Sequence, residues 1–447
     1  MPFLSYFAGL LTGAMPVALL LLGLYFILRL RCFPFRHPLR TARLLFSGSG
    51  ASLRATWMAL AGTVGVGNIT GVAIAITTGG AGSVFWMWLC SLSAMILKYA
   101  EITLSMADRR PDGHGGYRGG TPYSMRVAGL APLGSLFALL CLGYTLLIGG
   151  AVQANAVAEC LFDSFSLSPA VCGGLLVLLS LPVIAGGGQR ISALTARLVP
   201  LMCFAYVAAT LAVIVSHRAA LPGVVATILR EAFSPAAAAG GGLGFFSARA
   251  MRVGAARGLM SNEGGCGTSP MAHVTAAAQT PARQGLFGIL EVFVDTTVIC
   301  TLTALALLSA LPTLPAGHSG ASLVRLAFSS VFGQASGALL SLLLFFFAYA
   351  TVLCQAFYAQ VCLGSLTRAR GAGRLFLFAF GASLLLGAIS TPAFVWKACD
   401  LLLAVMTICN LVLLWRQRNR IVSLSAELLP AGQKKSGVPF STPRPPA

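Results

Sequence analysis

Long apolar runs dominate this sequence and set the strictest limit on how it folds. A run of about 20 apolar residues can cross the hydrocarbon core of a bilayer as one helix. Of the 447 residues, 57% are hydrophobic and 9% are charged, whereas a soluble protein has about 25% charged residues. The sequence therefore predicts an all-α polytopic membrane protein with about eleven transmembrane helices. The predicted spans lie at about 4–28, 57–80, 83–106, 134–158, 168–187, 196–216, 236–258, 285–311, 334–364, 373–389 and 394–415.

Basic residues predict how these spans are oriented. A net charge of +19 would favour nucleic-acid binding in a soluble chain, but here the arginines gather in alternate loops. Basic residues accumulate in cytoplasmic loops, so the arginine-rich stretch from Arg29 to Arg54 predicts an amino terminus outside and a carboxyl terminus in the cytoplasm. We expect an integral plasma-membrane protein, with a bacterial inner membrane favoured, and no nucleic-acid partner.

Two glycine-rich segments interrupt predicted spans. Residues 62–71 read Gly-Thr-Val-Gly-Val-Gly-Asn-Ile-Thr-Gly, and the segment 236–247 has four glycines within five residues. Non-helical backbone at membrane depth is tolerated where it lines a polar cavity. Each segment therefore predicts a broken helix whose free carbonyl and N–H groups can bind a cation and a carboxylate. Close packing of glycine-rich helices is the alternative, and it explains two matched segments less well.

The spacing of the two breaks predicts the domain organisation. They lie five spans apart, and an odd number of spans gives the two halves opposite orientations in the membrane. We expect a peripheral helix and basic loop at 1–56, two inverted five-helix repeats at 57–216 and 217–415, and a disordered cytoplasmic tail at 416–447.

Polar side chains within the spans are further candidates, each with a structural alternative. Lys98 and Glu101 are expected to form a local ion pair at i, i+3. Glu291 and Asp295 share a helix face, which fits an acid/base pair, a proton relay, or bonds to a nearby helix end or loop. Thr351 offers a hydroxyl oxygen either to a cation or to its own helix.

Motifs spread over residues 57–415 resemble the sodium:alanine (alanine or glycine:cation) symporter family. They include Gly62–Ala73, Lys98–Glu101, Gly186–Ile191 and Asp295-Thr296, and the most specific is Ser261-Asn262-Glu263, in a loop predicted to be cytoplasmic. The resemblance implies a leucine-transporter-like fold with ten core helices and two Gly-broken helices. It also implies sodium symport of a small neutral amino acid by alternating access, with no catalysis and no cofactor.

The same resemblance implies which residues bind the ligands. The substrate carboxylate would face N–H groups near the first break, the ammonium would face carbonyls of the second break, and Gln153 would line the pocket wall. The implied substrate-binding residues are Gly65, Val66, Gly67, Asn68, Gln153, Gly241, Gly242 and Gly244. Sodium, the coupling ion, would be held by the carbonyls of Ala61, Val64 and Phe347 and by the Thr351 hydroxyl.

Departures from the family pattern leave the substrate and the coupling ion open. The family usually has threonine at the positions of Val66 and Ala350, and glycine at the position of Glu291. Coupling to protons through Glu291 or Asp295 is the strongest alternative to sodium. An ion channel fits less well, because a potassium-type filter needs four loops around one axis. An intramembrane enzyme would need a motif such as His-Glu-x-x-His, which the sequence does not contain.

Overall fold

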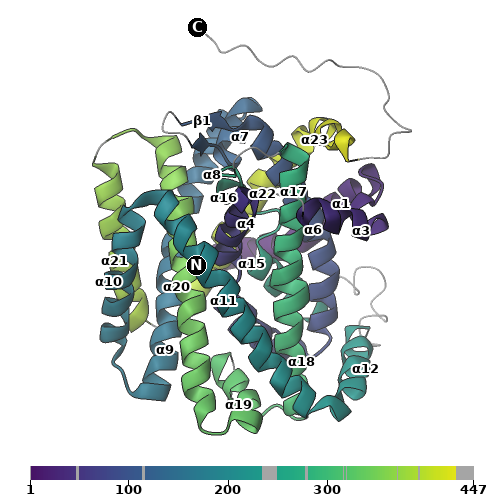
Figure 1. Ribbon diagram of the computed structural model, residues 1–447, viewed down its shortest axis with the longest axis vertical. Coiled ribbons are helices and arrows are strands. Elements are labelled where there is room, and N and C mark those ends of the chain that lie inside the picture. Colours follow the sequence, from purple (N-terminus) through teal and green to yellow (C-terminus); the bar gives the residue numbers. More distant parts are fainter. Residues whose placement is uncertain are drawn as a thin grey trace.

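Helices form nearly all the regular structure of the computed structural model (Figure 1). The structure describes residues 2–46, 50–112, 116–233, 249–276, 280–315, 317–318, 320–369, 371–390 and 393–428. Within these ranges the only strands are β1 (Arg110–Pro111) and β2 (Tyr117–Arg118), which pair antiparallel in a short hairpin. The long helices run roughly along the longest axis of the molecule. The predicted all-α architecture is confirmed.

The first half of the chain contains the bent span, which is followed by four long helical stretches. Two of its segments, η1 and η2, are π-helical, a rare form that often marks functional sites. The helical elements are α1 (Pro2–Arg29), α2 (Phe33–Arg36), α3 (Pro38–Phe46), α4 (Gly50–Thr63), η1 (Gly67–Gly71), α5 (Val72–Gly79), α6 (Ser83–Asp108), α7 (Thr121–Val127), α8 (Ala131–Tyr144), η2 (Thr145–Val152), α9 (Gln153–Phe165), α10 (Pro169–Ala185) and α11 (Gly187–Ser216).

The second half of the chain is also helical and holds a third π-helical segment, η4. The predicted second break, with Gly241, Gly242 and Gly244, lies outside the described residues. The described elements are η3 (Arg218–Ala220), α12 (Leu221–Ala232), α15 (Arg249–Asn262), α16 (Pro270–His273), α17 (Pro281–Val292), η4 (Phe293–Cys300), α18 (Thr301–Ala310), α19 (Ala321–Phe332), α20 (Ala335–Leu366), α21 (Ala372–Ile389), α22 (Ala393–Arg416), α23 (Arg418–Leu424) and η5 (Ser425–Glu427).

The number of spans can be compared with the prediction of eleven. Seven described helical stretches are long and apolar enough to cross a membrane, and the bent pair of α4 with η1 and α5 adds an eighth. The helix α10 is apolar but has only 17 residues, and part of the predicted span 236–258 lies outside the described residues. The total of eleven and the two repeat boundaries therefore stay predictions.

Small residues let the helices approach closely. A Cβ atom added at Gly387 of α21 would lie 2.2 Å from the Ala151 Cα atom of η2, and one added at Gly173 of α10 would lie 2.9 Å from the Ala388 Cβ atom of α21. Large apolar side chains such as Leu178 and Phe378 point outward and are 69% and 76% exposed. Small residues between helices and apolar side chains on the periphery are what a bundle surrounded by lipid requires.

Candidate functional site

The first predicted break is present between α4 and η1, where the chain bends by 55°. The Val64 N–H still donates to the Leu60 carbonyl (2.7 Å), but the Gly65 N–H donates to the side-chain oxygen of Asn68 (2.9 Å). Asn68 therefore satisfies an N–H group that has no partner within the helix, as a cap does at a helix start. The second half-helix, η1 with α5, begins beyond this turn.

Gly65 packs directly against side chains from two other spans. A Cβ atom added at Gly65 would lie 2.6 Å from Thr351 Oγ1 and 3.6 Å from Gln153 Oε1. Thr351 Oγ1 donates to the Phe347 carbonyl at 3.1 Å. Gln153 is 3% exposed, and among the described residues its Oε1 atom has no hydrogen-bond partner. The structure thus brings Gly65, Gln153 and Thr351 together from α4–η1, α9 and α20.

The remaining predicted ligands of the first break lie in the same buried region. Ala61, Val64, Val66 and Phe347 are each 0% exposed, and Gly67 is half-buried. The Val66 carbonyl accepts a hydrogen bond from the hydroxyl of the residue one turn later (2.9 Å). The predicted sodium ligands other than Thr351 are backbone carbonyl oxygens. Their role in ion binding stays a prediction.

The side chain of Asn68 is committed to a polar cluster with η4 and α15. Its Nδ2 atom donates to Asp295 Oδ1 (2.8 Å) and to Ser261 Oγ (2.9 Å). Asp295 Oδ2 accepts from Ser261 Oγ and from Thr296 Oγ1, both at 2.8 Å. All four side chains are buried, so these bonds replace the water that the carboxylate gives up. Asn68 therefore links the break to η4 and α15.

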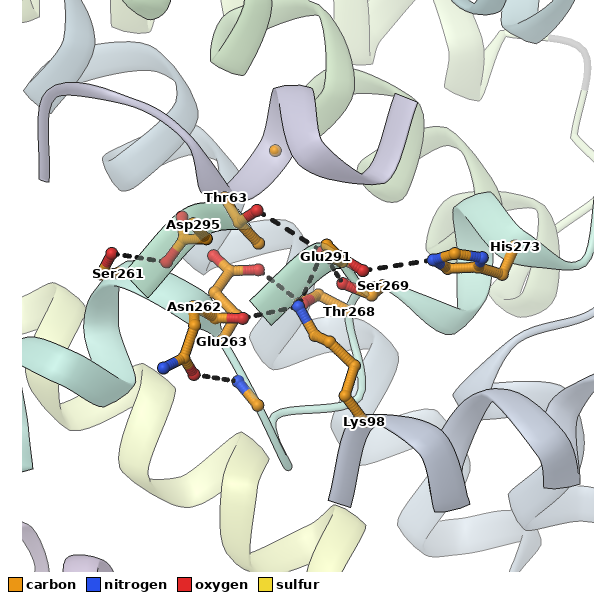
Figure 2. A network of polar contacts seen from close by, with 12 residues as sticks. Thr63, Lys98, Ser261, Asn262, Glu263, Thr268, Ser269, His273, Glu291 and Asp295 are labelled. Atoms are coloured by element: carbon orange, nitrogen blue, oxygen red, sulfur yellow. Dashed lines mark hydrogen bonds and ion pairs between the residues drawn. The ribbon is translucent and has the colours of Figure 1, made fainter. Parts of the chain in front are cut away.

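Lys98 forms a buried ion pair with Glu291, as Figure 2 shows. The Nζ atom lies 2.7 Å from Glu291 Oε1 and donates to the Asn262 carbonyl at 2.5 Å. The predicted pair of Lys98 with Glu101 is wrong. The helix α17 packs against α6 and brings a carboxylate directly to the ammonium, and a desolvated pair with such geometry prevails over a local i, i+3 contact.

Glu291 is also held by three hydrogen-bonding side chains. Ser269 Oγ donates to Oε1 at 2.8 Å, Thr63 Oγ1 donates to Oε1 at 3.4 Å, and His273 Nε2 lies 3.2 Å from Oε2 (Figure 2). Thr63 is the last residue of α4. The Glu291 carboxylate therefore connects α6, α16 and the end of the helix that precedes the break, which accords with the predicted bonding to a nearby helix end or loop.

The Ser-Asn-Glu segment and the residues after it fold into the protein interior. Glu263 is 2% exposed and has a left-handed backbone (φ 49°), a conformation rare for a residue with a side chain. Its carboxylate accepts from Thr268 Oγ1 (2.5 Å), Tyr144 OH (2.8 Å) and Gln355 Nε2 (3.1 Å). This stretch is not a solvent-exposed loop, because these bonds hold it in the interior against α8 and α20; the cytoplasmic side predicted for it stays a prediction.

The charges of this interior are unbalanced. Glu101, Glu263, Glu291 and Asp295 are all buried, and Lys98 is the buried ammonium among them. A bare buried charge is very unfavourable, so each of these carboxyl groups must be paired with a cation, hydrogen-bonded or neutral; Glu291 has both Lys98 and His273 beside it. In the described part of the chain no group of three His, Cys, Asp or Glu residues could hold a metal ion.

Sequence comparisons decide the family. The sequence model described as the sodium:alanine symporter family matches residues 2–431. The chain belongs to this family. Members of the family are membrane transporters, and the chain is accordingly an integral membrane transporter and not an enzyme. The resemblance drawn from the Ser261-Asn262-Glu263 motif and its companions is confirmed.

Several named proteins align with most of this chain. The sodium/alanine symporter AgcS of Methanococcus maripaludis is 34% identical, over 89% of this chain and 90% of its own length. The amino-acid carrier protein AlsT of Bacillus subtilis is 33% identical, over 93% of this chain and 89% of its own. The probable sodium/glutamine symporter GlnT of Bacillus subtilis is also 33% identical, over 89% of this chain and 84% of its own length.

Solved structures of more distant transporters support the fold. The manganese transporter of Eremococcus coleocola (mutant H236A) has a TM-score of 0.54 and 14% identity, over 85% of this chain and 78% of its own. MhsT in complex with L-phenylalanine has a TM-score of 0.51 and 14% identity, over 83% of this chain and 98% of its own. These similarities confirm the leucine-transporter-like fold of this symporter-family chain.

Proposed function

We propose that this chain imports a small neutral amino acid, of the alanine or glycine class, together with sodium. The observation that carries the proposal is the contact of Gly65 with Thr351 and Gln153, which places a hydroxyl and an unpartnered amide oxygen at a broken helix. Membership of the sodium:alanine symporter family and the names of the relatives AgcS and GlnT support sodium coupling and an amino-acid substrate.

Sodium would bind where α20 meets the break. The carbonyls of Ala61, Val64 and Phe347 and the hydroxyl of Thr351 are buried oxygens without formal charge. Sodium prefers such oxygen ligands, as hard cations generally do. Thr351 now donates to the Phe347 carbonyl, and turning that hydroxyl hydrogen away would leave two oxygens directed at one ion.

The amino acid would bind beside the sodium ion. Its carboxylate would accept from the N–H groups of Val66 and Gly67, at the positive end of the η1–α5 half-helix. Its ammonium group would face the second break, with Gly241, Gly242 and Gly244, and the Gln153 Oε1 atom would line the pocket. If both ligands favour one closed state, each raises the affinity for the other. Alternating access of two inverted repeats, at 57–216 and 217–415, would then move them inward.

Proton coupling is the second candidate, and the surplus of buried carboxyl groups favours it. Glu291 is paired with Lys98, whereas Asp295 and Glu263 are held by neutral donors. A proton can neutralise such a group as sodium can, so the two ions must be separated by experiment.

Uptake by the purified full-length chain in proteoliposomes tests both candidates. Labelled alanine, glycine, serine and glutamine are offered under a sodium gradient at equal pH, and under a pH gradient without sodium. We expect saturable uptake of alanine or glycine under the sodium gradient alone. Uptake driven by the pH gradient without sodium would contradict sodium coupling and support the second candidate.

One substitution tests the sodium ligand. Thr351→Ala removes a hydroxyl oxygen, and a charge-assisted contact of about 1.5 kcal/mol corresponds to about a tenfold rise in the sodium concentration for half-maximal uptake. Thr210→Ala is the matched control, because Thr210 is equally buried and donates to a carbonyl one turn earlier on α11 (2.8 Å). Equal sodium dependence in the two variants would overturn the assignment of Thr351.

A further inference from the structure

The helix α3 lies between the predicted first span, at 4–28, and the bent span that begins with α4. The preceding helix α1 ends at Arg29, and the bent span begins with α4 at Gly50. The connection between two consecutive spans lies at one surface of the bilayer, so the predicted first span at 4–28 and the bent span together place α2 and α3 at that surface. One side of α3 packs against α17, and Thr41 on that side is 7% exposed.

A second side of α3 carries exposed apolar side chains. Leu39 is 83% exposed and Phe46 is 91% exposed. They are seven residues apart, which is close to two helical turns, so both project from the same face. Side chains of this size are rarely left so exposed in water when they share one helix face. Their position at the membrane surface gives them a natural environment in the acyl layer.

The side between these two is basic. Arg40 and Arg43 of α3 are three residues apart, which places them on one side of this helix, and Arg36 is the last residue of the preceding helix α2. All three are exposed, and in the described part of the chain none forms an ion pair. No aspartate or glutamate precedes Glu101 in the sequence, so the chain nearby supplies no negative charge to balance them.

We propose that α3 binds the anionic head groups of phospholipids, with Leu39 and Phe46 inserted among the acyl chains. The basic side lies beside the exposed apolar face, as it does in helices that lie in the plane of an anionic membrane surface. A zwitterionic lipid would accommodate the apolar side chains but leave the arginines without counter-charge.

Lipid retention measures this directly and does not depend on transport. The full-length protein is exchanged into mixed micelles of phosphatidylglycerol and phosphatidylcholine, washed, and the lipids that remain bound are quantified by mass spectrometry. Each arginine near an anionic surface contributes about a fivefold change in partitioning at low salt. We expect Arg40→Gln with Arg43→Gln to reduce retained phosphatidylglycerol more than tenfold, on the order of 25-fold, and to leave phosphatidylcholine unchanged.

A matched variant removes the same charge elsewhere. Arg110 and Arg118 are exposed and face each other across the β1–β2 hairpin, so Arg110→Gln with Arg118→Gln should retain phosphatidylglycerol as the wild type does. Leu39→Ser with Phe46→Ser should weaken retention of both lipids. Equal losses from the α3 and hairpin variants would show a general charge effect and overturn the proposal, as would no loss from the α3 variant. Either result leaves the proposed transport function intact.

Discussion

Replacing Gly65 with alanine probes the contact between the break and α20. The new Cβ atom would lie 2.6 Å from Thr351 Oγ1, whereas ordinary van der Waals contact begins at 3.4 Å. The Thr351 hydroxyl would have to turn away and give up its bond to the Phe347 carbonyl. Overpacking a dense interior in this way costs about 1–3 kcal/mol.

We expect Gly65→Ala to reduce sodium-driven alanine uptake about tenfold at a fixed sodium concentration, since 1.4 kcal/mol corresponds to a factor of ten. The reason is that the displaced hydroxyl no longer reaches the proposed ion site. Initial uptake rates in proteoliposomes over a series of sodium concentrations measure the effect, and the melting temperature in detergent measures the strain. Gly71→Ala is the matched control, because a Cβ atom there meets nothing within 4 Å.

A double variant separates strain from ion binding. Thr351→Ala removes the oxygen that the new Cβ atom strikes, so combining it with Gly65→Ala should restore the melting temperature without restoring the sodium affinity. The two effects are non-additive because the two residues are in direct contact. If Gly65→Ala behaves as Gly71→Ala does in both assays, the contact with Thr351 is not where the structure places it, and the reasoning about the sodium site fails.

Four further substitutions test the polar interior and the packing through the melting temperature. Glu291→Leu leaves Lys98 buried without its partner and should lower the unfolding free energy by about 3–5 kcal/mol, and adding Lys98→Met should recover most of it; no recovery would contradict the pairing. Tyr144→Phe removes a donor to Glu263 and should cost about 1–3 kcal/mol, and an unchanged melting temperature would argue against that bond. Gly387→Ala places a Cβ atom 2.2 Å from the backbone of η2 and should lower the melting temperature. An unchanged melting temperature would contradict the close packing of α21 against η2.

The features that sequence predicted well are those encoded in one short stretch. The break at 62–71 was predictable because glycine weakens a helix locally, whatever surrounds it. The contact of Gln153 and Thr351 with this break was expected only through the family resemblance, since nothing in either local sequence names its partner. The local sequence also predicted that the Thr351 hydroxyl can bond to its own helix, and it does donate to the Phe347 carbonyl one turn earlier.

The features that sequence missed depend on packing between distant segments. Lys98 lies three residues from Glu101 but bonds to Glu291, because the register of α6 against α17 decides which carboxylate arrives. Nothing in the apolar sequence around Tyr144 indicates that its hydroxyl donates to Glu263, because the two residues meet only in the folded protein. The polar, glycine-rich stretch that follows Ser261 is typical of a solvent-exposed loop. It is buried because distant residues such as Tyr144 and Gln355 bond to Glu263.

The end of α4 is tied to two buried carboxylates, and this restricts how the break can move. Thr63 donates to Glu291, and Gln355 donates both to the Gly62 carbonyl (3.4 Å) and to Glu263 (3.1 Å). If the break tilts during alternating access, these bonds must be exchanged together, because a buried charge left without a partner is costly. Partly shifted arrangements would therefore be disfavoured, and a transition between two discrete positions would be expected in place of a continuous movement. Ligands bound at Gly65, as we propose, would act on this element.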